Sequence, residues 1–238
     1  MRAYYSNGVL WLFILGMVGC ASFSNENRID DMPMYGQPEV VREEYRQKAD
    51  AAFIKDAANG FGGNRKMASA AWAKEAEAHF NKRNLHYAMR RYNQSWLLDP
   101  ENYQPYVGFG RITLARREYD DAFKHFKRAI ELINDPFQKP VLLANTAVAY
   151  HNKANSLDNS QAKERERYFD WANSYFEEST QLDPSYPNSW ASWAYSLFKQ
   201  GKYKESWLKL AKLREFAPEY INKELYNELS EVYPEPGT

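Results

Sequence analysis

Small and aromatic residues recur along the central part of the chain at a fixed interval of 34 residues. Trp72, Ala76, Ala88, Tyr92 and Pro100 are matched 34 residues later by Tyr106, Gly110, Ala122 and Phe126, with Asn134 where a proline would fall. Ala172, Phe176 and Pro184 are matched in the same way by Ser206, Leu210 and Pro218, and Trp190 and Ala194 take the positions of Trp72 and Ala76. This periodicity predicts repeated pairs of antiparallel helices.

The physical basis of the pattern is visible within one unit. Ala76 and Ala88 are small where two helices must approach closely, and aromatic side chains such as Tyr92 fill the space around that contact. Pro100 lacks a backbone N–H and restricts the residue before it, so it ends the second helix. A single pair of helices leaves one apolar face uncovered, and the next unit must bury that face.

The interval of 34, with small residues 12 apart and a proline 12 beyond the second, resembles the tetratricopeptide repeat (TPR) over residues 69–218. The resemblance implies an all-α fold, a right-handed α-solenoid of about four TPR helix-turn-helix units with capping helices at both ends. Within residues 67–218 the units fall at about 69–102, 103–136, 140–186 and 187–218. Proteins of this family usually hold peptides, so the resemblance implies a binding scaffold and not an enzyme.

The third unit is longer than the others. Its two small residues, Ala147 and Ala172, lie 25 residues apart instead of 12, so the unit carries 13 extra residues at about Asn155–Arg167. These polar and charged residues either lengthen the helices around a solvated loop or form a protrusion that contacts a partner. Three further residues, together with Pro136 and Pro140, bend the junction between the second and third units.

The segments on either side of the repeats have the pattern of covering helices. Residues 39–66 combine a helix and a glycine-rich turn, and the helix is expected either to cover the first unit or to bind a partner. Its apolar positions follow three-to-four spacing and are Val41, Tyr45, Ala49, Ala52, Phe53 and Ala57. Residues 219–238 place Tyr220, Leu225, Leu229 and Val232 on one side of a terminal helix, which is typical of the solvating cap that such arrays need.

The N-terminal residues predict export and lipid attachment. In the ten residues Val9–Val18 only Gly16 is not strongly apolar, and this run is too short to span a bilayer but fits a secretory signal peptide. Residues 17–20 resemble a bacterial lipobox, which implies that residues 1–19 are a lipoprotein signal peptide and that Cys20 is acylated. Cys20 is the only cysteine, so it forms no disulfide within the chain. An ordinary cleaved signal peptide and a buried thiol are the alternatives.

Residues 20–38 separate the acylation site from the first expected helix. The stretch is poor in apolar periodicity and contains Asn25, Asn27, Asp30, Asp31, Pro33 and Pro38. This composition predicts a flexible tether. Ala21 stands where lipoproteins retained in the inner membrane carry aspartate, so the resemblance implies the outer membrane, on its periplasmic face.

Composition and spacing exclude several classes of function. The chain has 31 lysines and arginines and 31 acidic residues, and without a basic stripe it is not expected to bind nucleic acid. The histidines are His79, His86, His125 and His151, and none of them has metal-ligand spacing to another ligand. His79 and Glu75 are interpreted as a surface contact. We predict no catalytic residue, no metal and no cofactor, because nucleophile elbows and phosphate loops are also missing from the sequence.

The remaining candidate site is the inner surface that the first helices of the units share. Helical periodicity turns one stripe inward, and its candidate binding residues are Glu77, Phe80, Asn81, Arg111, His151, Asn152, Tyr195, Phe198 and Lys199. A carboxylate clamp is disfavoured, because Ala73 and Glu77 occupy positions where clamp-forming relatives carry polar or basic residues. The alternative is that each stripe residue only packs between helices.

These observations favour a lipid-anchored periplasmic adaptor that binds a segment of another envelope protein. Such a protein resembles pilotins and other assembly lipoproteins, and it would act in envelope complex assembly or secretion. The second hypothesis is a structural or cell-wall-associated spacer whose contacts are made by the third-unit insertion and the caps. An enzyme is the third class, and the sequence offers it no residue.

Overall fold

The computed structural model describes residues 29–236, so the signal-like segment and Cys20 lie outside the described residues. The described part is all-α and contains no strand. Its ten α-helices are α1 (Glu44–Asn59), α2 (Arg65–Asn81), α3 (Leu85–Leu98), α4 (Tyr103–Ala115), α5 (Tyr119–Leu132), α6 (Gln138–Ser156), α7 (Ala162–Leu182), α8 (Pro187–Lys199), α9 (Tyr203–Phe216) and α10 (Lys223–Val232). None of these helices has both the length and the apolar character needed to cross a membrane.

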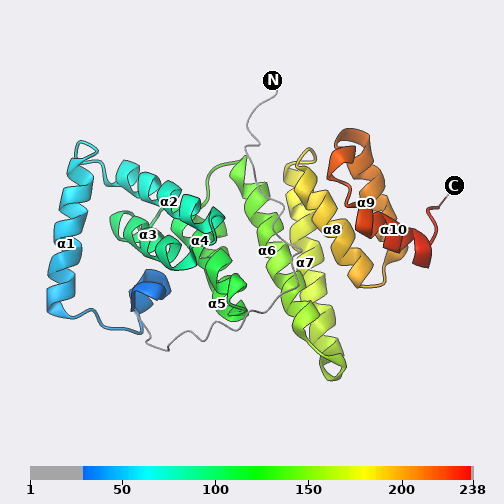
Figure 1. The fold of residues 1–238 in the computed structure, drawn as a ribbon, viewed down its shortest axis with the longest axis horizontal. Coiled ribbons are helices and arrows are strands. Elements are labelled where there is room, and N and C mark those ends of the chain that lie inside the picture. The colour runs from blue at the N-terminus through cyan, green and yellow to red at the C-terminus, as the bar shows by residue number, and fades with distance from the viewer. Residues whose placement is uncertain (1–28, 237–238) are drawn as a thin grey trace.

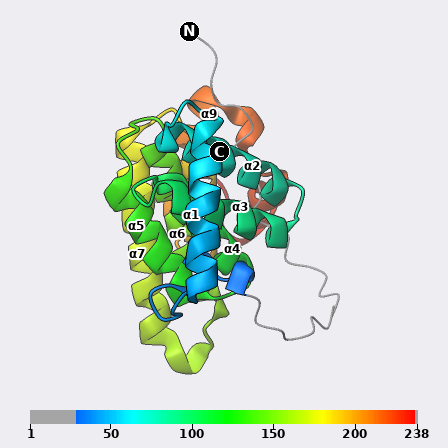
Figure 2. The ribbon, with the colours of Figure 1, turned by 90° about the vertical axis from the view of Figure 1, so that its left-hand side faces the viewer.

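Helices α2 to α9 form four successive pairs that stack side by side into an elongated solenoid (Figure 1). The pairs are α2 with α3, α4 with α5, α6 with α7, and α8 with α9, and each pair packs on the next one. Viewed from the N-terminal end, α1 lies across the end of this array (Figure 2). The fold class expected from the repeat pattern is therefore confirmed.

The small residues of the repeat pattern lie at the closest helix contacts. Ala76, Ala88, Ala122 and Ala172 are all fully buried. A Cβ atom added to Gly110 would lie 2.7 Å from the Phe126 ring, so the second unit has no space for a larger residue at that position. The sequence register of the units is thus the register in which the helices pack.

Two aromatic residues repeat one hydrogen bond in different units. The Tyr106 hydroxyl donates to the Pro100 carbonyl at 2.9 Å, and the Trp190 indole donates to the Pro184 carbonyl at 2.9 Å. In both units the ring belongs to the first helix and the proline follows the preceding second helix. In these two units the hydrogen bond of the aromatic side chain therefore connects the loop to the helix that follows it.

The additional residues of the third unit lengthen its two helices. Helix α6 has 19 residues and α7 has 21, whereas α4 and α5 of the second unit have 13 and 14. A short 3₁₀ turn, η3 (Asn159–Gln161), joins the two long helices. The α6–α7 hairpin extends beyond the other pairs at the lower side of the view in Figure 1.

The junction between the second and third units differs from the other two junctions. First helices pack directly on each other in the pairs α2–α4 and α6–α8, whereas α6 packs mainly on the second helix α5. Asp135 accepts backbone hydrogen bonds from Phe137 and Gln138 at the start of this turn. The Phe123 and Tyr150 rings stack across the junction, with centroids 4.2 Å apart.

Part of the predicted tether is packed on the array, which corrects that expectation for residues 29–38, here called the strap. Two 3₁₀ turns, η1 (Ile29–Asp31) and η2 (Pro33–Gly36), lie against α3, and Tyr35 is buried. The side-chain amide of Asn93 donates to the carbonyls of Asp30 and Met32 at 3.2 and 2.9 Å. The strap follows no helical or strand period, so its sequence gives no periodic signal of packing.

The two terminal helices cover the array to different extents. Helix α1 packs on the array through Ala57 and through Phe53 on the Trp72 ring. Tyr45, near the start of the helix, is 61% exposed, and Val41, which precedes the helix, is 84% exposed. Helix α10, preceded by η4 (Pro218–Tyr220), buries Leu225 and Leu229 against the last pair.

Candidate functional site

The predicted stripe follows equivalent positions of the four first helices. Glu77, Arg111, Val148 and Tyr195 occupy one position, and Phe80, Leu114, His151 and Phe198 occupy the next on the same face. Asn81, Asn152 and Lys199 follow directly after this second set in units one, three and four. The structure exposes these equivalent residues to very different degrees, because each is covered by a different neighbour.

In the first two units the stripe contains a polar cluster that connects α2 with α4. Arg111 donates to the Glu77 carboxylate at 2.6 Å, and the buried Tyr92 hydroxyl donates to the same oxygen at 2.8 Å. The Arg111 guanidinium also lies 3.9 Å from the centre of the Phe80 ring. Both charged side chains remain partly exposed.

The ionisation of Glu77 follows from these contacts. Burial alone would raise its pKa, but the charge of Arg111 and the hydrogen bonds from Arg111, Tyr92 and Asn81 outweigh it and lower the pKa. Glu77 is therefore charged at neutral pH, and a partner reaching this cluster would meet a carboxylate already paired with an arginine.

In the third unit the structure contradicts the prediction that His151 faces a partner. His151 is buried together with Ala144 and Val148, because α8 packs directly on this face of α6. One ring nitrogen lies 3.0 Å from the Ser196 hydroxyl, and the other contacts the Asn155 amide at 2.6 Å. Burial, assisted by the charge of Lys199, lowers the pKa of His151 to about 4. His151 is a neutral packing residue.

In the fourth unit the stripe is open again. Tyr195 and Phe198 are half-buried and Lys199 is exposed, with its ammonium group 5.1 and 5.2 Å from the two ring centres. This arrangement parallels the first unit, where the ring of Phe80 also lies beside a cation. The exposed aromatic edges and the nearby charge suit contacts with a peptide.

Two open hollows lie on the described surface, and neither is lined by a residue of the stripe. One open hollow of about 440 Å³ lies at the C-terminal end, beside Arg214, Pro218 and Tyr226. Another, of about 500 Å³, lies between the strap, α1 and α3. The described residues also contain no group of three or more histidines, cysteines or carboxylates placed to hold a metal ion.

Sequence reasoning missed an aromatic cluster at the middle junction. Tyr168, Trp171 and Tyr175 line one face of α7 at three-to-four spacing and contact Tyr150, which stacks on Phe123. Trp171 is exposed. Burial and the neighbouring Tyr175 and Tyr168 raise the pKa of Tyr150 to about 12. The spacing on α7 was a usable signal, but the contribution of α5 required the junction geometry.

Comparisons with known proteins add little to this picture. No protein-family model matches the chain, and no curated protein sequence matches it significantly. A structure of Pseudomonas aeruginosa PilF is 17% identical, with 72% of this chain and 86% of that chain covered and a TM-score of 0.36. YrrB, a TPR protein with an unusual peptide-binding site, is 15% identical, with 75% and 99% covered and a TM-score of 0.30. At these values neither likeness supports a functional argument.

Proposed function

We propose that the protein is a lipid-anchored periplasmic adaptor that binds a segment of another envelope protein. In this proposal Cys20 is acylated and attaches the chain to the periplasmic face of the outer membrane, where the adaptor serves complex assembly or secretion. The short apolar run before Cys20, without the length to span a bilayer, supports the anchor. The partner binds through the first-helix stripe.

The observation that carries the binding surface is the recurrence of an accessible aromatic ring beside a cation. The rings of Phe80 and Phe198 occupy equivalent positions near the two ends of the array. The cation beside Phe80 is Arg111 of the next unit, and the cation beside Phe198 is Lys199 of the same helix. Aromatic and arginine side chains contribute disproportionately to protein interfaces, since they bury much area and still offer a polar or charged group. These two ring–cation pairs lie on either side of the third unit, whose stripe is buried. They suit a partner segment that contacts both ends of the array.

Site-specific photo-crosslinking in intact cells tests this binding surface. A photoreactive amino acid at Asn81 or Lys199, both exposed, should crosslink to one and the same envelope protein. The matched control is Lys127, which is exposed on the second helix α5 and should give no such product. Crosslinks from Lys127 alone would contradict the stripe proposal.

The anchor is tested separately by Cys20→Ser. The acylated protein should fractionate with outer membranes, and the variant should move to the soluble periplasmic fraction, since the thioether-linked lipid would be lost. Equal fractionation of the two proteins would contradict the anchor.

A structural spacer is the second candidate, and the long α6–α7 hairpin favours it. The hairpin turn is exposed, and Trp171 and Tyr168 lie on the α7 side of the aromatic cluster. A spacer of this kind would crosslink to the cell wall or another protein from Asn159 in η3. The same experiment therefore separates the two functions by the position that gives the product.

A further inference from the structure

The turns between the paired helices of the first two units each place an arginine in a left-handed backbone conformation. In the fourth unit Gly201 has a φ of +73°, and its N–H donates to the Phe198 carbonyl while the next N–H donates to Leu197. Arg83 and Arg117 occupy the equivalent positions, with φ of +59° and +64° and the same pair of backbone hydrogen bonds. A left-handed conformation is strained for arginine and unstrained for glycine, so the arginines are not explained by turn geometry.

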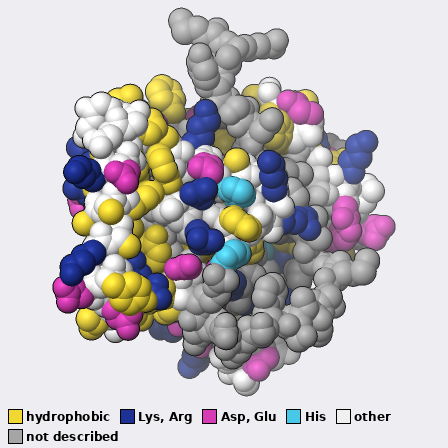
Figure 3. All heavy atoms as spheres, turned by 60° about the vertical axis from the view of Figure 1, so that its left-hand side comes forward, with side chains coloured by type: hydrophobic (Ala, Val, Ile, Leu, Met, Phe, Trp, Pro, Cys, Tyr) yellow, Lys and Arg dark blue, Asp and Glu magenta, His cyan; other side chains and the backbone are white. Residues whose placement is uncertain are grey.

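These arginines belong to a larger basic surface. We define the basic patch as Lys82, Arg83, Arg90, Arg116 and Arg117 around Tyr87, a residue that is 48% exposed. The Tyr87 ring stacks on His79 and meets His86 edge-on. On the face drawn in Figure 3, lysine and arginine side chains gather around two histidines and adjoining hydrophobic atoms.

The net charge of the basic patch is positive. Among the described residues, these five cations stand against the strap carboxylates of Asp30 and Asp31 and against Glu118, which follows Arg117 in the chain. Asp31 pairs with His86, and Asp30 lies 4.0 Å from Arg90. Glu75, at the far edge, is paired with Arg91 at 3.0 Å. Excess arginine and lysine around an exposed tyrosine is the composition that suits an anionic lipid–water interface.

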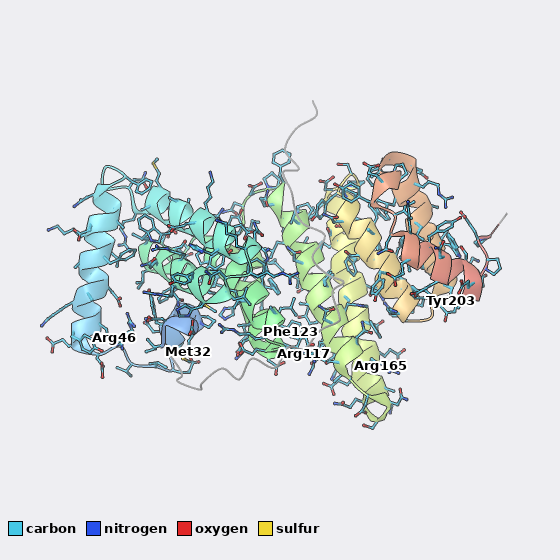
Figure 4. The ribbon with its side chains drawn as sticks, viewed as in Figure 1. Met32, Arg46, Arg117, Phe123, Arg165 and Tyr203 are labelled. Atoms are coloured by element: carbon cyan, nitrogen blue, oxygen red, sulfur yellow. The ribbon has the colours of Figure 1, made fainter. Side chains whose placement is uncertain are left out.

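The strap brings the N-terminal side of the chain to the basic patch. Arg116 donates to the Asp31 carbonyl at 2.8 Å, and Figure 4 places Met32 and Arg117 on the same lower side of the molecule. Only eight residues separate Ile29 from Cys20, so even a fully extended connection spans no more than about 30 Å. A lipid at Cys20 would therefore hold the basic patch close to the membrane.

We propose that the basic patch is a second membrane contact, which binds the headgroups of anionic phospholipids and turns this side of the array toward the bilayer. The orientation rests on the proposed lipid anchor at Cys20, but headgroup binding itself is a property of the folded array. The lipid would attach the chain, and the patch would add an electrostatic contact that sets which side of the array faces the bilayer. The opposite side of the array stays accessible to the periplasm.

The test uses the full mature chain carrying Cys20→Ser, so that no lipid contributes, with vesicles of phosphatidylethanolamine containing either phosphatidylglycerol or phosphatidylcholine. We expect binding to the anionic vesicles only, weakening with salt because the charges are exposed. Arg83→Gly with Arg117→Gly should lower the partition coefficient by about 30-fold, since each removed cation near the surface contributes about fivefold. Because glycine suits the left-handed turns, the melting temperature should stay the same or rise.

The matched control removes two charges elsewhere, by Lys66→Gln with Lys223→Gln, both exposed on other parts of the array. It should leave vesicle binding nearly unchanged, and Tyr87→Ala should weaken it several-fold. Equal losses in both double variants, or equal binding to the two vesicle types, would overturn the proposal. Binding to polyglutamate but not to anionic vesicles would also overturn it and indicate an acidic protein partner. These outcomes are independent of the Cys20 fractionation, which tests the anchor alone.

Discussion

In the first two units the stripe of first-helix residues is held by an ion pair and remains partly open, whereas in the third unit the same stripe is covered by a neighbouring helix. Glu77 and Arg111 connect α2 to α4 through charged groups that stay partly exposed. Val148, at the position of Glu77 and Arg111, and His151, at the position of Phe80, are buried beneath α8. The repeat register therefore decides which face of the helix a residue occupies, while the packing of the next unit decides whether that face is accessible.

The largest loss of stability is expected from placing a large side chain at the closest helix contacts, either in the first two units or in the third. Ala122→Arg in the second unit and Ala172→Arg in the third should each destabilise the fold by several kcal/mol, on the order of 4, because no space exists for the buried charge. Chemical unfolding measures the loss. The control Ala78→Arg makes the same change at an exposed position of α2 and should cost little. A wild-type midpoint for Ala122→Arg would refute the packing register.

Mild acid should destabilise both halves through one buried histidine in each. Burial lowers the pKa of His125 in α5 to about 4, with a smaller increase from Asp121 and a smaller further decrease from Lys124. The pKa of His151 in α6 is also lowered to about 4. The unfolded chain binds these protons near pH 6.5 and the folded chain does not, so stability falls as pH drops from about 6.5 to about 4. The loss is about 3 kcal/mol for each histidine at the lower end.

Histidine NMR signals check this prediction directly. At pH 5 the signals of His125 and His151 should still be those of neutral rings. A full titration of either ring near pH 6.5 in the folded protein would contradict the buried, neutral assignment.

Partner capture should depend on the open part of the stripe in the fourth unit. Tyr195→Ala should weaken binding by about 1–3 kcal/mol, the range typical of a truncated aromatic anchor, while the melting temperature changes little. The measurement is a binding titration with the crosslinked partner. Deleting Ser156–Ala162 from the hairpin is the parallel variant, and normal binding by Tyr195→Ala with loss on deletion would assign the contact to the hairpin.

The smallest effect is expected from the ion pair of the first half. A double-mutant cycle with Glu77→Gln and Arg111→Gln should give a coupling of about 1 kcal/mol, reduced by solvent because both side chains are partly exposed. The folded-state pKa of Glu77 is lowered, so its stabilisation is present above the unfolded-state pKa and is lost as pH falls through the folded-state value. A coupling of zero at neutral pH would show that the pair does not hold the units together.

The sequence predicted most of the fold because helix packing imposes strict local requirements. Only small residues fit at Ala76, Ala88 and Ala122, so their spacing alone revealed the pairs and their order. The lengthening of the third unit was also readable from spacing. Predicting the site was harder, because exposure depends on a third helix. His151 has the register of a stripe residue, yet the packing of α8 on α6 removes it from the surface.

The packing of the strap on the array was not predicted, for a different physical reason. Met34 and Tyr35 hold a left-handed backbone, with φ of +52° and +54°, that only their tertiary environment stabilises. Asn93 looks like an ordinary polar residue on α3, but its amide holds the strap backbone. Likewise, Arg83 and Arg117 are unremarkable until their turn conformation is known.

The strap also sets the contact order of the first half. Contacts between neighbouring units join residues about one repeat apart, as Glu77 and Arg111 are at 34 positions, whereas the strap joins Asp30 to Asn93 across 63 positions and Asp31 to Arg116 across 85. Contacts across such long loops form late in folding, because closing the loop costs chain entropy before the strap contacts can compensate for it. The helix pairs can thus fold in order as the chain emerges, and the strap closes last. We therefore expect the strap to open before the helix pairs, so its amides should show the earliest hydrogen exchange of the packed N-terminal region.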